Sequence, residues 1–251
     1  MDRKYELLKD DHIEYEGRTL YRIKALRDFS DVKAGDIGGY IESEKNLSQD
    51  GSCWVYDNAK VFNNARVYQN AKVFDKAKVF GNAFVYGNAE VFGSAIVFDN
   101  AHISGNVVVF GNAKIFGYAH IFGNAEVFGS AIVYDNAEVY DNAYVYGNAE
   151  VYQNAKITCN SRVYGDAKIE EDTIIGKVSI TYKKIFQYQC AKRLLTAILT
   201  EDDKILYSLG CQDNITEEEF IDRIHNTFGG LKYNPHREEY LDIIKLLNIY
   251  L

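Results

Sequence analysis

A six-residue word repeats without insertion or deletion from about residue 53 to about residue 180. Ala59-Lys-Val-Phe-Asn-Asn is followed by Ala65-Arg-Val-Tyr-Gln-Asn, and the pattern continues to Ala167-Lys-Ile-Glu. A short and strict period predicts a solenoid, because each unit can bury its apolar side chains only against its neighbours. About half of the chain is therefore expected to be repeat scaffold.

The charges in each word decide which side chains face the interior. Side chains alternate across a strand, so Ala and Val share one face while the residue between them shares the other face with Phe or Tyr. The position between Ala and Val carries charged residues such as Lys60, Arg66 and Glu90, and these must face water. The Ala and Val positions are therefore predicted to form the core, and the aromatic positions to lie outside.

The last two positions of each word are predicted to turn a corner. They read Gly-Asn at 81–82 and Asp-Asn at 99–100, and similar pairs occur along the repeat. Gly and Asn tolerate the left-handed backbone conformation that a tight corner needs. Alternating Val and Ala also suit an interior too narrow for two large side chains at each corner.

The spacing of aliphatic and small residues resembles the hexapeptide repeat of left-handed parallel β-helices. This resemblance implies three words, or eighteen residues, in each triangular coil, and thus about seven coils between residues 53 and 180. The family usually has Gly, Ala or an acid after the aliphatic residue, where this chain has Phe or Tyr. The fold class expected is an all-β solenoid, a left-handed parallel β-helix with an N-terminal β cap and a small C-terminal α+β domain.

The segment 25–48 is similar to the start of hexapeptide-repeat proteins that are common in bacteriophages and prophages. That resemblance implies a phage or prophage protein of unassigned activity. We expect a non-catalytic scaffold or binding protein, which presents its aromatic flanks and a C-terminal module to a partner. The partner expected is a host protein, whose system the chain would inhibit, or a small ligand.

The aromatic positions form three stripes when they are sorted by an eighteen-residue coil, and the third stripe is interrupted at Ser104 and Thr158. Stacked rings would stabilise a slender core. Long apolar stripes also mark assembly surfaces. We therefore predict a homo-oligomer, a dimer or trimer, formed through the middle of the rod. The binding residues predicted there are Phe92, Phe98, Phe110, Phe116, Phe128, Ile96, Ile132 and Val108.

A pair of histidines carries the alternative function. His102 and His120 are eighteen residues apart, so they are predicted to lie one above the other on the outside, with Ser104 close by. Many hexapeptide-repeat proteins are acyltransferases that use a solenoid His as general base, so the resemblance makes these residues the catalytic candidates. Such enzymes usually carry a loop that interrupts the repeat, and the words here run unbroken. The main prediction is therefore no catalytic residue and no cofactor.

No metal site is predicted. Zinc carbonic anhydrases of this fold need three His, whereas two lie in the repeat here. The four cysteines show no Cys-x-x-Cys spacing and are predicted to be reduced thiols, although a disulfide between Cys190 and Cys211 stays open.

The ends of the chain are expected to cap the solenoid. Residues 1–46 are predicted to form a β-hairpin cap around Gly17, residues 47–180 the β-helix, and residues 181–251 a small α+β domain. Ile41, Leu47 and Cys53 are expected to stand in register with the Ala positions. In the last segment, strands are predicted at 185–190, 194–200 and 204–210. A capping box at 216–219 is expected to open one helix, and Pro235 a second.

Charge and hydropathy bound the remaining partners. The net charge of −8 is spread along the 251 residues and no segment is basic, which argues against nucleic-acid binding. No apolar run approaches the roughly 18 residues of a membrane span, and the N-terminus has no apolar signal region. A cytoplasmic protein without a membrane partner is expected, in the host cytoplasm if the chain is phage encoded.

Overall fold

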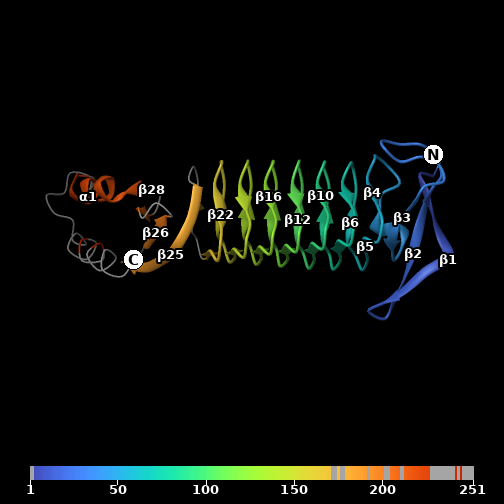
Figure 1. Cartoon of the computed structure of the whole chain (residues 1–251), viewed down its shortest axis with the longest axis horizontal. Helices are drawn as coiled ribbons and strands as arrows, with labels where there is room; N and C mark the ends of the chain where they lie inside the picture. The colour runs from blue at the N-terminus through green and yellow to red at the C-terminus, as the bar shows by residue number, and fades with distance from the viewer. Residues whose placement is uncertain are drawn as a thin grey trace.

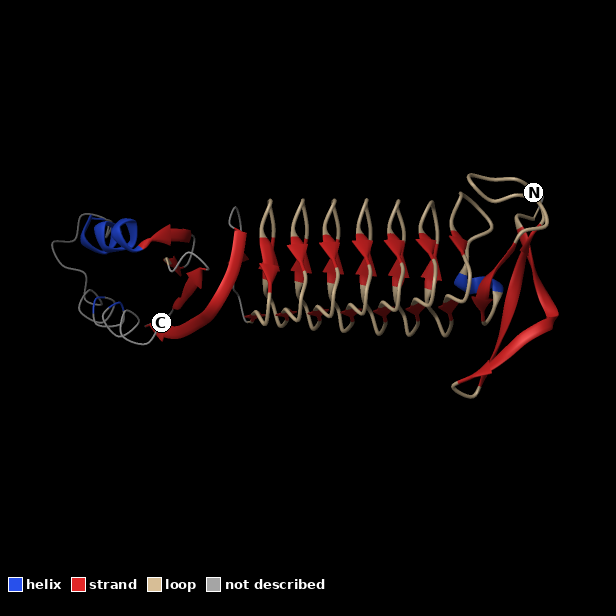
Figure 2. Ribbon diagram, in the orientation of Figure 1, coloured by secondary structure: helices blue, strands red, loops and turns tan. Residues whose placement is uncertain are grey.

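The computed structural model describes residues 3–170, 174–175, 179–190, 193–200, 204–209, 212–226, 241 and 244. Figure 1 shows a rod of regularly stacked coils, with a β-hairpin at the N-terminal end and the C-terminal strands and helix at the other. Coloured by secondary structure, the coils consist of short strands joined by loops (Figure 2). The all-β solenoid expected from the repeat is thus confirmed.

The N-terminal end contains three longer strands. β1 (Tyr5–Tyr15) and β2 (Arg18–Ala25) form an antiparallel hairpin, with positive φ angles at Glu16 and Gly17 in its turn. β3 (Ile37–Ile41) is antiparallel to β2 and parallel to β5, the first repeat strand of its sheet. The 3₁₀ helix η1 (Glu44–Asn46) follows β3.

Each word then contributes one strand of two or three residues. The repeat strands are β4 (Trp54–Val55), β5 (Lys60–Val61), β6 (Arg66–Val67), β7 (Lys72–Val73), β8 (Lys78–Val79), β9 (Phe84–Val85), β10 (Glu90–Val91), β11 (Ile96–Val97), β12 (His102–Ile103), β13 (Val108–Val109), β14 (Lys114–Ile115), β15 (His120–Ile121), β16 (Glu126–Val127), β17 (Ile132–Val133), β18 (Glu138–Val139), β19 (Tyr144–Val145), β20 (Glu150–Val151), β21 (Lys156–Ile157), β22 (Arg162–Tyr164), β23 (Lys168–Ile169) and β24 (Ile174–Ile175).

The repeat strands belong to three sheets, one on each side of the coil. Every third strand pairs in parallel, as β12 does with β9 and β15, so partners are eighteen residues apart. One side belongs to a ten-stranded sheet, one to an eleven-stranded sheet, and the third is a seven-stranded sheet from β6 to β24. The three-word coil implied by the resemblance is therefore present.

The interior is filled by the Ala and Val positions. From Ala59 to Ile169 these two positions are fully buried in every word, whereas the charged and aromatic positions face outward. At the corners, glycine or a short polar residue takes positive φ, such as 70° at Gly81 and 56° at Asp99. The inside–outside assignment made from the charges is confirmed.

The first coil corrects one prediction. Ile41 pairs with Val61 and Leu47 with Val67, so both residues are twenty positions from their partners and lie in the Val lane, not the Ala lane. Trp54 pairs with Lys72 at the normal spacing of eighteen. The extra two residues lie in the loop between Leu47 and Cys53, where Gly51 has a φ of 67°.

The C-terminal strands extend one side of the solenoid. β25 (Ser179–Cys190) is parallel to β22, and β26 (Arg193–Thr200), β27 (Ile205–Leu209) and β28 (Gln212–Thr216) follow it antiparallel in the eleven-stranded sheet. Helix α1 (Glu217–Asn226) begins with a capping box between Thr216 and Glu219. The second predicted helix lies largely outside the described residues, and Cys211 lies outside them too.

Candidate functional site

The outer aromatic side chains form two continuous ladders, and a third that is interrupted at Ser104 and Thr158. Ring centroids of neighbours one coil apart lie 4.5 Å apart for Phe74–Phe92 and 5.1 Å apart for Phe80–Phe98, with planes within 10° of parallel. Stacking of this kind leaves each ring only partly exposed, and it contributes about 0.5–1.5 kcal/mol per pair. The ladders therefore stabilise the rod and give its outer surface an aromatic character.

The residues predicted to bind a partner divide between two sheets. The ring ladder of Phe92, Phe110 and Phe128 runs along one corner of the triangular rod, where the strands of one side finish. Ile96 and Ile132 lie just past that corner, at the start of the strands of the next side. Phe98 and Phe116 lie at the far end of that next side, and Val108 precedes Phe110 on the first side. All eight predicted residues are partly buried.

The two histidines lie on the seven-stranded sheet, where β12 and β15 place them side by side. Their imidazole rings are 4.7 Å apart and 19° from parallel, and the ring of Phe84 covers the other side of His102 at 4.9 Å. Burial lowers the pKa of His102, and the neighbouring His120 lowers it further. Beyond His120, the same outward line continues with Glu138, whose carboxylate pairs with Lys156 at 3.1 Å.

Ser104 leaves a gap in the ring ladder next to these histidines. Tyr86 and Phe122 occupy the same lane one coil before and one coil after Ser104. Each stacks on the ring on its other side, Tyr86 on Tyr68 and Phe122 on Tyr140. Ser104 therefore interrupts this lane, and no ring of the lane lies between Tyr86 and Phe122. Thr158, the second interruption, is filled differently, because its hydroxyl donates to the carboxylate of Asp141 at 2.6 Å.

We expect His102 to titrate below the ordinary histidine pKa of 6.5, and the substitution His120→Asn to move that pKa part of the way back. The unfolded chain then binds the proton more readily than the folded protein between the lowered pKa and 6.5, so stability falls as pH drops through that window. Ring resonances in a proton–carbon NMR titration would report the pKa, and the chain has 5 histidines to assign. A pKa of His102 at or above 6.5 would contradict this expectation.

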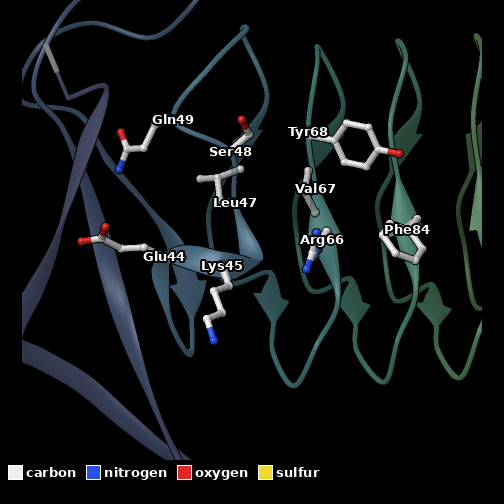
Figure 3. A pocket seen from close by; sticks show the side chains of 9 residues that line it. All are labelled: Glu44, Lys45, Leu47, Ser48, Gln49, Arg66, Val67, Tyr68 and Phe84. Carbon is white, nitrogen blue, oxygen red and sulfur yellow. The ribbon is translucent and has the colours of Figure 1, made fainter. Parts of the chain in front are cut away.

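A pocket that the sequence did not predict opens at the N-terminal end of the same sheet. Its volume is about 540 Å³, and it is lined by residues from η1 and the loop after it, from β6 and the residue that follows, and from the start of β9 (Figure 3). The lining residues are Glu44, Lys45, Leu47, Ser48, Gln49, Arg66, Val67, Tyr68 and Phe84. The sequence signal that could have found it is the departure from the eighteen-residue period before Cys53.

The longer first coil explains why the pocket exists. The amide of Ser48 donates to the carbonyl of Val67, so Ser48 occupies the aromatic lane one coil before Tyr68. A serine therefore occupies the place of a ring at this end of the ladder, as Ser104 does farther along. One face of Tyr68 stacks on Tyr86 at 4.8 Å, and the pocket adjoins the other end of this ring stack.

The described parts of the chain contain no cluster of three His, Cys, Asp or Glu side chains that could hold a metal ion. Cys53 and Cys159, whose side chains the structure describes, are free thiols. None of the helices in the described ranges has the length and apolar character to cross a bilayer.

Comparison with known proteins gives one partial relative. A stretch of 47 residues, 18% of this chain, is 51% identical to the uncharacterized acetyltransferase YdcK of Escherichia coli (strain K12). The match covers 14% of that protein's length, so the chain aligns with a small part of it. No protein-family model matches the sequence.

Proposed function

We propose that this protein is a non-catalytic scaffold that binds a partner along the outer surface of its solenoid. The observation that carries the proposal is the continuity of the ring ladders over an unbroken series of coils, which makes a rigid surface with aromatic character. Rigid aromatic side chains are favoured at binding surfaces, since they contribute a large contact area and lose little conformational entropy.

The partner in this proposal is a host protein or a small ligand. A host protein or a small ligand fits a chain encoded by a phage or prophage, and that origin rests on the resemblance of residues 25–48 alone. The C-terminal strands and α1 would offer a second contact surface, because they add a unit with its own core around Tyr207 and Phe220.

Self-association through the middle of the rod is a further part of the proposal. Phe92, Phe110 and Phe128 form an apolar line along one corner, and Ile96 and Ile132 lie just beyond it with Lys114 between them. A second copy would cover this line and form a dimer or trimer. A mass of 28.6 kDa, that of a single chain, in light scattering at micromolar concentration would remove this part of the proposal.

Acyl transfer is the second candidate function. Two observations favour it: the partial identity with a protein named as an acetyltransferase, and the lowered pKa of His102, which keeps its imidazole neutral and able to accept a proton near pH 7. The acceptor hydroxyl or amine of a substrate would lie beside the imidazole pair, with the Ser104 gap providing space. The donor would be an acyl thioester.

A thermal-shift experiment with acetyl-CoA separates the two candidates. A scaffold is expected to show no effect of acetyl-CoA on the melting temperature that depends on the histidines, so the parent protein, His102→Ala and His120→Ala should respond alike. Lys114→Ala, which changes an exposed residue of another sheet, is the matched control. Stabilisation by acetyl-CoA that both histidine variants abolish, and that the control keeps, would overturn the scaffold proposal in favour of acyl transfer.

A further inference from the structure

The pocket before β6 combines two kinds of binding group. Aromatic surface comes from Tyr68 and Phe84, whose ring centroids are 6.4 Å apart at nearly perpendicular angles. Leu47 and Val67 also line the pocket, and both are fully buried. A volume of about 540 Å³ is in the range that holds small organic ligands.

Positive charge is the second feature of this pocket. Arg66 and Lys45 are exposed, and within the described ranges the side chain of neither forms a hydrogen bond or ion pair with another residue. The one acidic side chain in the lining, Glu44, already pairs with Arg3. Two uncompensated cations therefore border the pocket, although the chain as a whole carries a net charge of −8.

We propose that this pocket binds a small ligand that has both a planar ring and an anionic group. The ring would lie where Ser48 interrupts the ladder and would extend the Tyr68–Tyr86 stack by one step. The anionic group would face the guanidinium of Arg66, which can donate two hydrogen bonds to a carboxylate, sulfonate or phosphate, with Lys45 adding a second charge. This site is separate from the proposed partner surfaces in the middle of the rod.

Three chemically matched probes test the two requirements together. Naphthalene-1-sulfonate carries both a ring and an anion, indole carries a ring alone, and methanesulfonate an anion alone. Isothermal titration calorimetry of the full chain is expected to show millimolar or tighter binding of naphthalene-1-sulfonate, and at least about tenfold weaker binding of each half. Raising the salt concentration should weaken the binding of the sulfonate.

Variants locate the binding in this pocket. Arg66→Gln removes the guanidinium and is expected to weaken naphthalene-1-sulfonate binding by about tenfold, which corresponds to about 1.4 kcal/mol. Ser48→Phe fills the vacant ring position and should abolish binding. Lys114→Gln, which removes an exposed cation on the ten-stranded sheet, should leave binding unchanged.

Several outcomes would overturn the proposal. It is wrong if naphthalene-1-sulfonate fails to bind at millimolar concentration, if indole binds equally well, or if Arg66→Gln binds the sulfonate as tightly as the parent protein. Arg66→Gln alters an exposed side chain and should fold normally, so it stays decisive even if Ser48→Phe does not fold. Acetyl-CoA also carries a planar ring and anionic phosphates, so the variants assign its binding: stabilisation by acetyl-CoA that Arg66→Gln abolishes, and that His102→Ala and His120→Ala keep, belongs to this pocket.

Discussion

Gly39→Ala is expected to detach the N-terminal cap from the solenoid and to lower the free energy of unfolding by about 3 kcal/mol. A β-carbon at this position would lie 2.7 Å from the carbonyl oxygen of Ala59 and 2.8 Å from that of Tyr56. Both atoms belong to the backbone of the next coil, which cannot move without disturbing the repeat. The melting temperature and the urea midpoint measured by circular dichroism would report the loss.

The same substitution is expected to cause self-association. β3 holds the first repeat strand of its sheet through hydrogen bonds from the amides of Tyr40 and Glu42, of 2.9 and 3.2 Å. Without them that edge of the solenoid would be open, and open strand edges pair with other chains. Light scattering should then show a mass that rises with concentration beyond the mass of the parent protein.

Gly17→Asn is the matched control for the cap. Gly17 has a φ of 73° and open space around its α-carbon, and Asn tolerates this conformation better than other residues with a β-carbon. It should change stability by less than about 1 kcal/mol and should not cause association. If Gly39→Ala unfolds at the same urea concentration as Gly17→Asn, the close approach of β3 to the first coil does not stabilise the cap.

The periodic part of the fold was predictable from the sequence because two independent signals agree there. The charge at Lys60, Arg66 and similar positions fixes one face as exterior, and Gly or Asp with Asn after each strand fixes the corners. Both signals recur every six residues, so an error in one word would be corrected by its neighbours. The depth of burial at Ala59 through Ile169 follows directly.

The first coil was not predictable in the same way, because no second word confirms its register. Counting back from Ala59 by eighteen residues reaches Ile41, which the structure pairs instead with Val61. Nothing in the chain before Cys53 repeats, so the loss of the period there does not show where the two additional residues lie. This shift also places Ser48 beside Tyr68 and creates the pocket.

The candidate site was predictable in part for the same reason. The spacing of His102 and His120 lies inside the periodic region, so their stacking follows from it. Glu44 and Lys45 reach the pocket from η1, which lies outside that region. The partial burial of Phe98 and Phe110 also depends on how closely the rings stack, and this depends on side-chain angles that the period does not specify.

Lys4→Ala is expected to lower the free energy of unfolding by about 3 kcal/mol, since it removes a fully buried ammonium with several partners. Its Nζ donates to the carbonyl oxygens of Cys53 at 2.9 Å and Asp50 at 3.3 Å, and to Sγ of Cys53 at 3.2 Å. Burial lowers the pKa of Lys4, which reflects the cost of taking its charge out of water. Only the surrounding acceptors make that burial tolerable.

The carbonyl oxygens that accept from Lys4 are also the reason why its substitution should lower the free energy of unfolding strongly. Asp50 and Cys53 belong to the lengthened loop of the first coil, whose backbone carbonyls depend on Lys4 for hydrogen bonds that the repeat supplies elsewhere. Lys4→Met keeps most of the side-chain volume but lacks the hydrogen-bond donors, so it should lower the free energy of unfolding less than Lys4→Ala does. Both should lower it more than Lys114→Ala, which removes an exposed lysine. Urea denaturation of the three variants measures this order. Equal midpoints for Lys4→Ala and Lys114→Ala would show that the ammonium does not hold the loop, and that the first coil keeps its irregular path without it.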